Sequence, residues 1–344
     1  MEKRVLLLLI ILASFIVISC SDKKTNNNFI GITIYRTDDP FANSLKNNIE
    51  KFISGRAKYI VNDSQNNQTT QNSQIDNYIS KGAKVLVVNL VDTQAAQDIV
   101  NKAKNSDTPI ILFNKSPDPS VMNSYDKVWY VGTLSEEAVN IQGKIIADSW
   151  KANPSWDKNG DGKIQCVILE GEPGHADTKI RTENLISFIE NSSIELEILD
   201  KKTAMWNRDR AKNIVDFWMS NHNDNEDSDT KIEYIFSNND EMALGALKSV
   251  QGFGYNKGES NKFIPIVGID AINETIKEIE NGNIVGTVLN DSLTQAKAIS
   301  DLAVNLFKNE TLNPILGTIW TLDNTKSVRV HYKPITIEFS DEIN

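Results

Sequence analysis

The sequence FIGITIYRTDDPF, residues 29–41, decides the fold, because it joins a short apolar run to a polar cluster. Apolar residues occupy both alternating sides of this run, which is typical of a strand buried on both faces of a parallel sheet. Similar runs follow at 58–62, 84–90 and 109–113. Helical patterns lie between these runs, at about 40–55, 70–81 and 93–105. This βαβ rhythm predicts a doubly wound sheet covered by helices.

The same rhythm restarts after a helical pattern at 134–152. Strand candidates then lie at 164–169, 194–199, 232–236, 264–268 and 284–289. Helix candidates lie at 176–191, 207–220, 239–252 and 271–281. A last helix is predicted near 292–308, and strand-like runs lie near 327–339. Because 344 residues exceed one simple core, we predict an α/β fold with two doubly wound parallel-sheet lobes.

The first 28 residues differ in composition from the rest of the chain. Lys3 and Arg4 precede an almost entirely apolar run from Val5 to Ile18, which is shorter than the roughly 20 residues of a membrane-spanning helix. This pattern predicts an export signal at 1–19. The run ends in Ser19-Cys20, similar to a bacterial lipobox, so we predict a lipidated Cys20 and a polar tether through residue 28. The alternative is an ordinary secretory signal.

The formal net charge is -10, with 46 acidic and 36 basic residues. An acidic protein repels the phosphates of nucleic acids and acidic lipids. We therefore predict no nucleic-acid partner, and contact with a membrane only through the lipid anchor, on its periplasmic or outer side. Cys166, the other cysteine, lies in an apolar run, and we expect it to be buried without a disulfide.

Polar residues directly follow six of the predicted strands, as at Asp39, Asn114, Asn239, Asp270 and Asn290. Ligands of open α/β sheets bind beyond the carboxyl ends of the strands, so these residues predict one polar pocket between the lobes. Asn, Asp and Arg side chains offer the fixed hydrogen-bond geometry that sugar hydroxyls need. The rings of Phe41 and Trp206 are candidates to cover the faces of a sugar ring.

Ten segments between about residues 30 and 300 resemble the bacterial periplasmic galactose/glucose-binding proteins, among them GEPGHADTKIRT, TAMW, NNDEMALGA and GTVLNDSLTQAKA. The resemblance implies a multi-strand hinge that closes two lobes on D-glucose or D-galactose. It implies delivery of the sugar to the membrane permease of an ABC transporter. It also implies a first lobe of residues 29–133 plus 290–326 and a second lobe of residues 134–289 plus 327–344. The family also signals to chemotaxis receptors, and on this role the sequence is silent.

The resemblance further implies a set of sugar-binding residues, with two rings covering the sugar faces and the others bonding its hydroxyls: Asp39, Phe41, Asn114, His175, Asp177, Arg181, Trp206, Asn239, Asp270 and Asn290. The carboxylate that matches Asp39 accepts an axial or an equatorial hydroxyl, which explains tolerance of both epimers. Some of these residues have structural alternatives. Asp39 and His175 can cap helices, Asp177 can be a first-turn acid, and Trp206 can belong to the core.

A polar loop at 157–165 has the ligand spacing of an EF-hand through its ninth position. Its candidate calcium ligands are Asp157, Asn159, Asp161, the backbone carbonyl of Lys163, and Gln165. The twelfth position, which should be Glu, is Ile168. The resemblance supplies the missing carboxylate from Glu233 and implies a structural calcium ion. The alternative is a surface turn without a metal.

Three other functions compete with sugar capture. A glycosidase needs two carboxylates around the scissile bond, but the family uses Asp39, Asp177 and Asp270 to hold an intact sugar, so we predict no enzyme activity. A repressor of the lactose type needs a DNA-binding domain before residue 29. Ribose-binding relatives share the segment NNDEMALGA, so another monosaccharide such as ribose is the alternative ligand. We expect a monomer.

Overall fold

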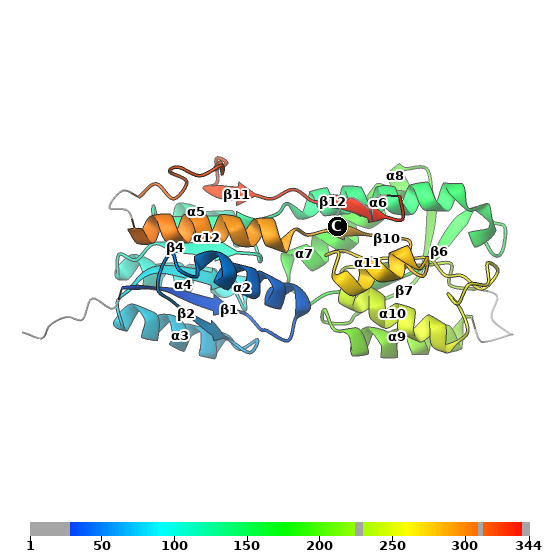
Figure 1. The fold of residues 1–344 in the computed structure, drawn as a ribbon. Helices are drawn as coiled ribbons and strands as arrows, with labels where there is room; N and C mark the ends of the chain where they lie inside the picture. The colour runs from blue at the N-terminus through cyan, green and yellow to red at the C-terminus, as the bar shows by residue number, and fades with distance from the viewer. Residues whose placement is uncertain (1–27, 224–229, 309–311, 339–344) are drawn as a thin grey trace, which may run out of the picture.

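The computed structural model describes residues 28–223, 230–308 and 312–338. The predicted export signal, Cys20 and the tether up to residue 27 lie outside the described residues. Two α/β lobes lie end to end, each built on its own sheet (Figure 1). The predicted fold class is therefore confirmed. Within the described ranges, no helix has the length and apolar character that crossing a membrane requires.

The first sheet has six parallel strands in the order β11-β5-β4-β3-β1-β2. Its strands are β1 (Phe29–Ile34), β2 (Tyr59–Asp63), β3 (Ala83–Asn89), β4 (Ile110–Phe113), β5 (Val128–Gly132) and β11 (Ser327–Arg329). Alternate residues of β3 belong to two different core clusters, with Val85 and Val87 in one and Leu86 and Val88 in the other. Both faces of the sheet are thus buried, as the apolar runs predicted.

The second sheet has the order β12-β10-β9-β8-β6-β7, and only β12 is antiparallel to its neighbour. Its strands are β6 (Lys163–Glu170), β7 (Glu195–Thr203), β8 (Tyr234–Ser237), β9 (Ile266–Val267), β10 (Gly286–Leu289) and β12 (Lys333–Thr336). Cys166 of β6 is a free, fully buried thiol, as expected from its apolar run.

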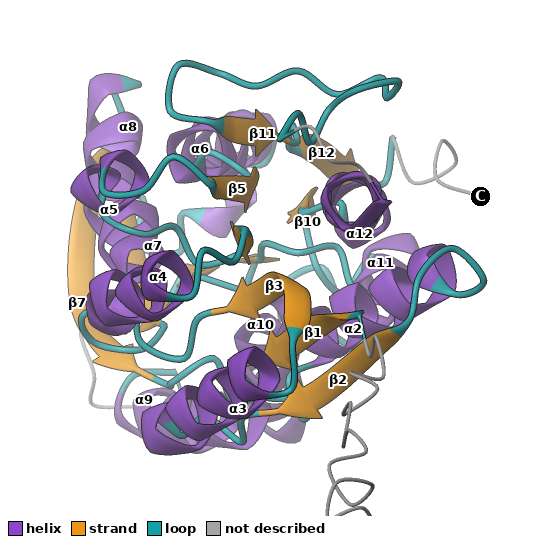
Figure 2. Ribbon diagram, turned by 90° about the vertical axis from the view of Figure 1, so that its left-hand side faces the viewer, coloured by secondary structure: helices purple, strands orange, loops and turns teal. Residues whose placement is uncertain are grey.

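Helices cover both faces of each sheet. Figure 2 shows α3, α4 and α5 on one side of the first sheet, with α2 and α12 on the other. The helices of this lobe are α2 (Pro40–Ile53), α3 (Gln68–Ser80), α4 (Ala96–Asn105) after the short turn η1 (Thr93–Ala95), α5 (Pro119–Asn123) and α12 (Ser292–Lys308). Those of the second lobe are α6 (Ser135–Ala152), α7 (Ala176–Lys179), α8 (Leu185–Asn191), α9 (Arg208–Asn221), α10 (Asp240–Gly252) and α11 (Asn273–Glu280), with the turn η2 (Pro154–Trp156) after α6.

The chain crosses between the lobes three times, after β5, after β10 and between β11 and β12. The last crossing differs from the predicted boundary at residue 326, because β11 pairs with β5 through Ser327, Val328 and Arg329. The run SVRVHYKPITI reads as one strand in sequence, but its two halves join different sheets. The crossing therefore lies at residues 330–332.

The predicted helix 176–191 is interrupted. A π-helical turn, η3 (Ile180–Asn184), separates α7 from α8. Such turns often occur at functional sites, because the extra residue redirects a side chain. Here the turn contains Arg181, which lines the pocket between the lobes.

Candidate functional site

One cavity lies between the carboxyl ends of the two sheets. All ten predicted sugar-binding residues line it, together with Tyr35 and Lys115. The full lining set is Tyr35, Asp39, Phe41, Asn114, Lys115, His175, Asp177, Arg181, Trp206, Asn239, Asp270 and Asn290.

Three of the lining residues also cap helices. Asp39 Oδ1 accepts a hydrogen bond from the amide of Ala42 at 2.8 Å. His175 Nδ1 accepts from the amide of Asp177 at 3.1 Å, and Asn239 Oδ1 accepts from the amide of Met242 at 3.1 Å. The capping and pocket interpretations of Asp39 and His175 are therefore both correct. With Nδ1 as the acceptor, a neutral His175 carries its proton on Nε2, and burial lowers the pKa of this ring.

Arg181 organises the charge on the second-lobe side of the pocket. Its Nη1 donates to the carbonyl of Asn238 at 2.9 Å, and its Nη2 lies 3.8 Å from Asp177 Oδ2. Its Nε is buried and has no hydrogen-bond partner among the described residues. A buried guanidinium donor without a partner is costly, so this atom offers a hydrogen bond to a ligand.

The pKa values of the two second-lobe carboxyls of the pocket are shifted in opposite directions. Burial acts to raise the pKa of Asp177, but His175 and Arg181 outweigh it and hold that pKa below its ordinary value. Burial raises the pKa of Asp270 well above its ordinary value. Asp270 Oδ1 accepts from Asn290 Nδ2 at 3.1 Å. The pocket thus contains one firmly ionised carboxylate and one that holds a proton more tightly.

Backbone strain is concentrated in the pocket. Asn114, Trp206 and Asp270 have φ angles of 65°, 57° and 128°. Such angles are uncommon outside glycine and cluster at binding sites. The Trp206 ring also lies close to Gly171, where an added Cβ would come within 2.0 Å of the indole. Glycine at this position therefore allows the ring to reach the pocket.

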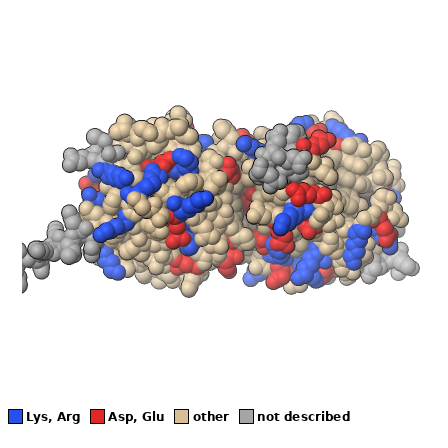
Figure 3. Space-filling model, in the orientation of Figure 1, with Lys and Arg blue, Asp and Glu red and all other residues tan. Residues whose placement is uncertain are grey.

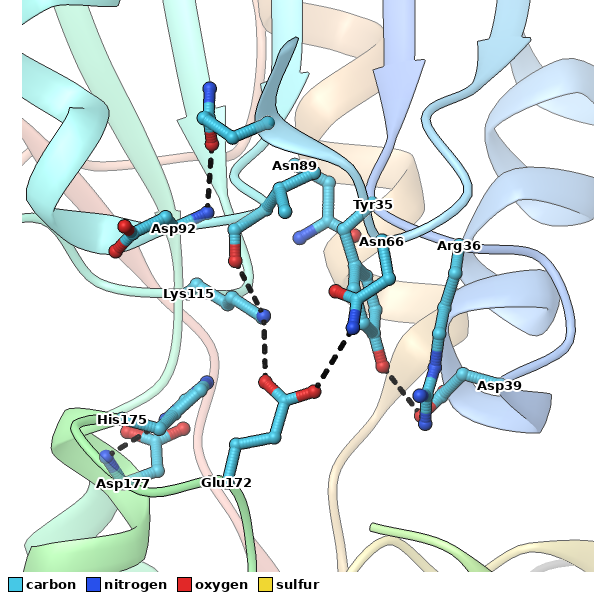
Figure 4. Close-up of polar contacts among 12 residues, drawn as sticks. Tyr35, Arg36, Asp39, Asn66, Asn89, Asp92, Lys115, Glu172, His175 and Asp177 are labelled. Carbon is cyan, nitrogen blue, oxygen red and sulfur yellow. Dashed lines mark hydrogen bonds and ion pairs between the residues drawn. The ribbon is translucent and has the colours of Figure 1, made fainter. Parts of the chain in front are cut away.

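A polar contact outside the predicted site joins the two lobes. Figure 4 shows Glu172 of the second lobe between Lys115 and Asn66 of the first. Lys115 Nζ lies 3.4 Å from Glu172 Oε2, and Asn66 Nδ2 lies 3.5 Å from Glu172 Oε1. The side chain of Lys115 is 4% exposed, and burial lowers its pKa although Glu172 opposes this shift.

Tyr35 supports the first-lobe side of the pocket. Its hydroxyl donates to Asp39 Oδ2 at 2.6 Å, and Lys115 Nζ lies 4.2 Å from the centre of its ring (Figure 4). Sequence reasoning did not assign Tyr35, Lys115 or Glu172 to the site. The available indication was their place at strand ends, because Tyr35 ends the predicted strand 29–35, and Lys115 and Glu172 lie two and three residues after the predicted strands 109–113 and 164–169.

The carboxylates of the predicted calcium loop accept hydrogen bonds from backbone amides of the same loop. Asp157 accepts from the amides of Gly160 and Gly162, and Asp161 accepts from the amide of Lys163 at 2.9 Å. Glu233 is 1% exposed and reaches the loop from the start of β8, where Oε2 accepts from the amide of Gln165 at 3.2 Å. The loop and the distant carboxylate are thus adjacent, as the resemblance implied.

The residues of this loop suit a calcium ion in their chemistry. The predicted ligands offer only carboxylate, amide and carbonyl oxygens. Gln165 Oε1 is buried and accepts no hydrogen bond from the described residues, and burial raises the pKa of Glu233, so a cation here would offset both costs. Within 28–223, 230–308 and 312–338, however, no three His, Cys, Asp or Glu side chains gather closely enough to hold a metal, because the loop carboxylates bond to loop amides.

Known proteins resemble this chain over nearly its whole length. A family described as "Periplasmic binding protein domain" matches residues 30–311. The D-galactose/methyl-galactoside binding periplasmic protein MglB of Haemophilus influenzae is 42% identical over 332 residues, which are 96% of each chain. The ribose import binding protein RbsB of Bacillus subtilis is 25% identical over 298 residues, 86% of this chain and 87% of that protein.

A solved structure has the same fold. The ABC transporter solute binding protein from Bacillus halodurans, with bound myo-inositol, has a TM-score of 0.73 and 25% sequence identity to this chain. The match covers 92% of this chain and 96% of that one.

Proposed function

This chain belongs to the periplasmic binding protein family, and we propose that it captures D-glucose or D-galactose between its lobes and delivers the sugar to an ABC transporter permease. The observation that supports the proposal is the shared cavity, to which both lobes contribute side chains able to hydrogen-bond sugar hydroxyls, with Phe41 from the first lobe and Trp206 from the second. The rings, Phe41 and Trp206, can cover the apolar faces of a pyranose.

The charge and hydrogen bonds of the pocket support a polyhydroxylated ligand. Asp39 accepts from Tyr35 and a helix amide, which leaves its remaining lone pairs for an axial or an equatorial hydroxyl. Arg181 Nε supplies an unused buried donor. A sugar that bonds both lobes stabilises the closed state in proportion to those contacts. Closed lobes then present one surface to the permease.

The choice of hexose over ribose rests on relatedness. Identity to the galactose-binding relative is 42%, against 25% for the ribose-binding one. The test is titration of residues 20–344 with glucose, galactose and ribose, monitored by intrinsic tryptophan fluorescence and by calorimetry. We expect saturable signals with at least one of the two hexoses and little response to ribose. A response to ribose alone would contradict the proposal. Incubation with nitrophenyl hexosides should release no nitrophenol.

We also propose that Cys20 carries the lipid anchor. The apolar run before it and the Ser19-Cys20 junction support this assignment. Metabolic labelling with a palmitate analogue should label the wild-type chain and not Cys20→Ser. Labelling of both would place the lipid elsewhere.

We further propose that the chain signals to a chemotaxis receptor. The test is chemotaxis towards galactose in cells that lack this chain.

A structural calcium ion is the last part of the proposal. Asp157, Asn159, Asp161, Lys163, Gln165 and Glu233 would hold it with oxygen ligands. The ion would replace the hydrogen bonds that the loop amides now make to the carboxylates. Calorimetric titration of chelator-treated protein should show one calcium bound per chain. A flat titration would remove the metal from the proposal.

A further inference from the structure

The net charge of -10 is distributed unevenly between the two lobes. Residues 28–133, 290–308 and 312–329, which build the first lobe, contain 15 Lys and Arg and 13 Asp and Glu. Residues 134–223, 230–289 and 330–338, which build the second lobe, contain 17 Lys and Arg and 24 Asp and Glu. The first lobe is therefore nearly neutral and slightly positive. The average charge that excluded acidic lipid as a partner does not describe this half of the molecule.

The positive charge of the first lobe gathers at one end. We compared the segments that run from the last turn of each helix to the residue before the next strand. In the first lobe (50–58, 77–82, 102–109, 120–127, 305–308 and 312–326) they contain nine Lys and Arg and four Asp and Glu. In the second lobe (149–162, 188–194, 218–223, 230–233, 249–265 and 277–285) they contain six Lys and Arg and seven Asp and Glu. Among the described residues, this edge is thus basic in the first lobe and nearly neutral in the second.

These first-lobe segments form one surface, which we call the basic end, with the exposed lysines Lys51, Lys58, Lys81, Lys104 and Lys308. Parallel strands place all their amino ends at one edge of the sheet. Backbone bonds fix two of the segments to strands of this sheet, because the carbonyl of Lys58 accepts from Ile30 of β1 at 2.9 Å and that of Lys326 accepts from Tyr130 of β5 at 3.2 Å. Basic side chains are visible over the outer part of this lobe in Figure 3.

The described chain begins at this same end. β1 starts at Phe29, so its amino end lies at the edge that carries the lysines and faces away from the second lobe (Figure 1). The nine residues from Cys20 to Asn28 can span at most about 32 Å. An acyl chain on Cys20 would therefore hold the basic end close to the bilayer. Lys23 and Lys24 add two positive charges within that short connection.

An apolar loop borders the basic end. Leu312, Leu316 and Ile319 are 50%, 55% and 80% exposed, and they are three of the nine large apolar side chains exposed in the described ranges. The loop is fixed to the last turn of α12, because Asn305 Nδ2 donates to the carbonyls of Pro314 and Leu316 at 2.9 and 2.8 Å. These three exposed side chains are thus carried by a loop that hydrogen bonds fix to α12.

We propose that the basic end and Leu312, Leu316 and Ile319 form a surface that rests on an anionic lipid bilayer. The lysines would face the lipid phosphates, and the loop side chains would enter the boundary between headgroups and acyl chains. The acidic second lobe lies at the far end of the molecule (Figure 1), well beyond the roughly 8 Å over which charge acts in physiological salt. The inference rests on the proposed anchor for its orientation.

The test measures binding without the anchor. Residues 20–344 with Cys20→Ser contain every described residue, so the fold is complete. Flotation with vesicles of phosphatidylcholine alone, or with about one-third phosphatidylglycerol, gives the partition of the protein. We expect binding to the anionic vesicles only, and its loss in high salt. No binding to anionic vesicles, or equal binding to neutral ones, would overturn the proposal.

Two matched variants separate local charge from total charge. The first replaces Lys51, Lys58, Lys81 and Lys104 with Glu, and the second replaces the exposed second-lobe residues Lys144, Lys201, Lys248 and Lys277 with Glu. Both change the net charge equally. Lysines near an anionic surface act individually, so the first variant should lower the partition by about tenfold or more and the second by less than about twofold. Equal losses would overturn the proposal.

A third variant tests the loop, and sugar titration provides the control. Leu316→Ser with Ile319→Ser should lower the partition onto anionic vesicles in low salt, and an unchanged partition would exclude the loop from the surface. Sugar affinity should be the same in all variants, so folding is checked on each. Failure of vesicle binding with intact sugar affinity and intact Cys20 labelling would reject this surface alone and leave the proposed function in place.

Discussion

The two lobes use the same arrangement of a six-stranded sheet between layers of helices, but they meet the cavity with different chemistry. The second lobe contributes His175, Asp177, Arg181 and Asp270, whose pKa values are all shifted by burial and by one another. The first lobe contributes Tyr35, Asp39, Phe41, Asn114 and Lys115. Because the charged groups of the second lobe already hold one another in place, we expect the sugar to bind that lobe first and the first lobe to close over it.

We expect the largest effect on sugar binding from removal of a second-lobe carboxyl. Asp270→Ala should weaken hexose binding by several hundredfold, about 4 kcal/mol, because Asn290 and the sugar lose an acceptor in a buried site. Asp39→Ala, on the first lobe, should weaken binding less and should lower the closed fraction. Calorimetry measures the affinities, and X-ray scattering measures closure. Equal effects of the two variants would contradict the order of binding.

The buried carboxyl of Asp240, in the second lobe, should make the free energy of unfolding depend on pH. Burial raises the pKa of Asp240 to about 6 from 3.8, so its protonated form favours the folded state. This contribution is complete below about pH 4 and is lost as the pH rises through 6, a change of roughly 3 kcal/mol.

Asp240→Asn keeps the contacts to Thr287 and the amide of Ile272 and removes the titration. Denaturant unfolding between pH 4 and 7 should show a steeper fall for wild type than for the variant. Parallel curves would show that Asp240 does not titrate in this range.

Calcium should stabilise the second lobe only. At a hundredfold excess over its Kd, the ion should add about 2.7 kcal/mol to the free energy of unfolding. Glu233→Gln should abolish this gain, and Glu190→Gln, an exposed change on α8, should not. Thermal unfolding with calcium and with chelator measures both. Hydrogen exchange should place the gain in β6 and β8, and protection of β1 instead would contradict the assignment.

The smallest expected effect concerns the contact between the lobes. Glu172→Gln removes the charge beside Lys115 and Asn66, but the amide oxygen can still accept from Lys115 Nζ, so we expect a loss of about 1 kcal/mol. We expect sugar affinity to fall two- to fivefold, with a more open sugar-free state in X-ray scattering. Glu183→Gln, whose partner Lys179 lies in the same lobe, is the control. An unchanged sugar-free state would show that Glu172 does not favour closure.

Sequence pattern identified most strands because the apolar runs are short, and those of the central strands β1, β4 and β8 are fully buried. It missed β5, where VWYVG follows a connection too short to contain an ordinary helix, since α5 has only five residues. It did not reveal the π-helical turn that directs Arg181 into the cavity. Glu172 and Lys115 are 57 residues apart in different lobes, so no local pattern could pair them.

The net charge of the whole chain is a poor guide to the charge on its surface. A single value of -10 described neither lobe, because charge is separated along the molecule. Only the strand order, which gathers the helix-to-strand segments at one edge, made the separation visible.

The helix-capping role of Asp39, His175 and Asn239 has a consequence for anyone who converts this protein into a biosensor. A substitution at these positions changes ligand preference and helix stability together, so libraries that vary them will be dominated by poorly folded clones. Phe41 and Lys115 line the same cavity without capping a helix. Retuning the sensor towards another sugar is therefore best begun at those two positions.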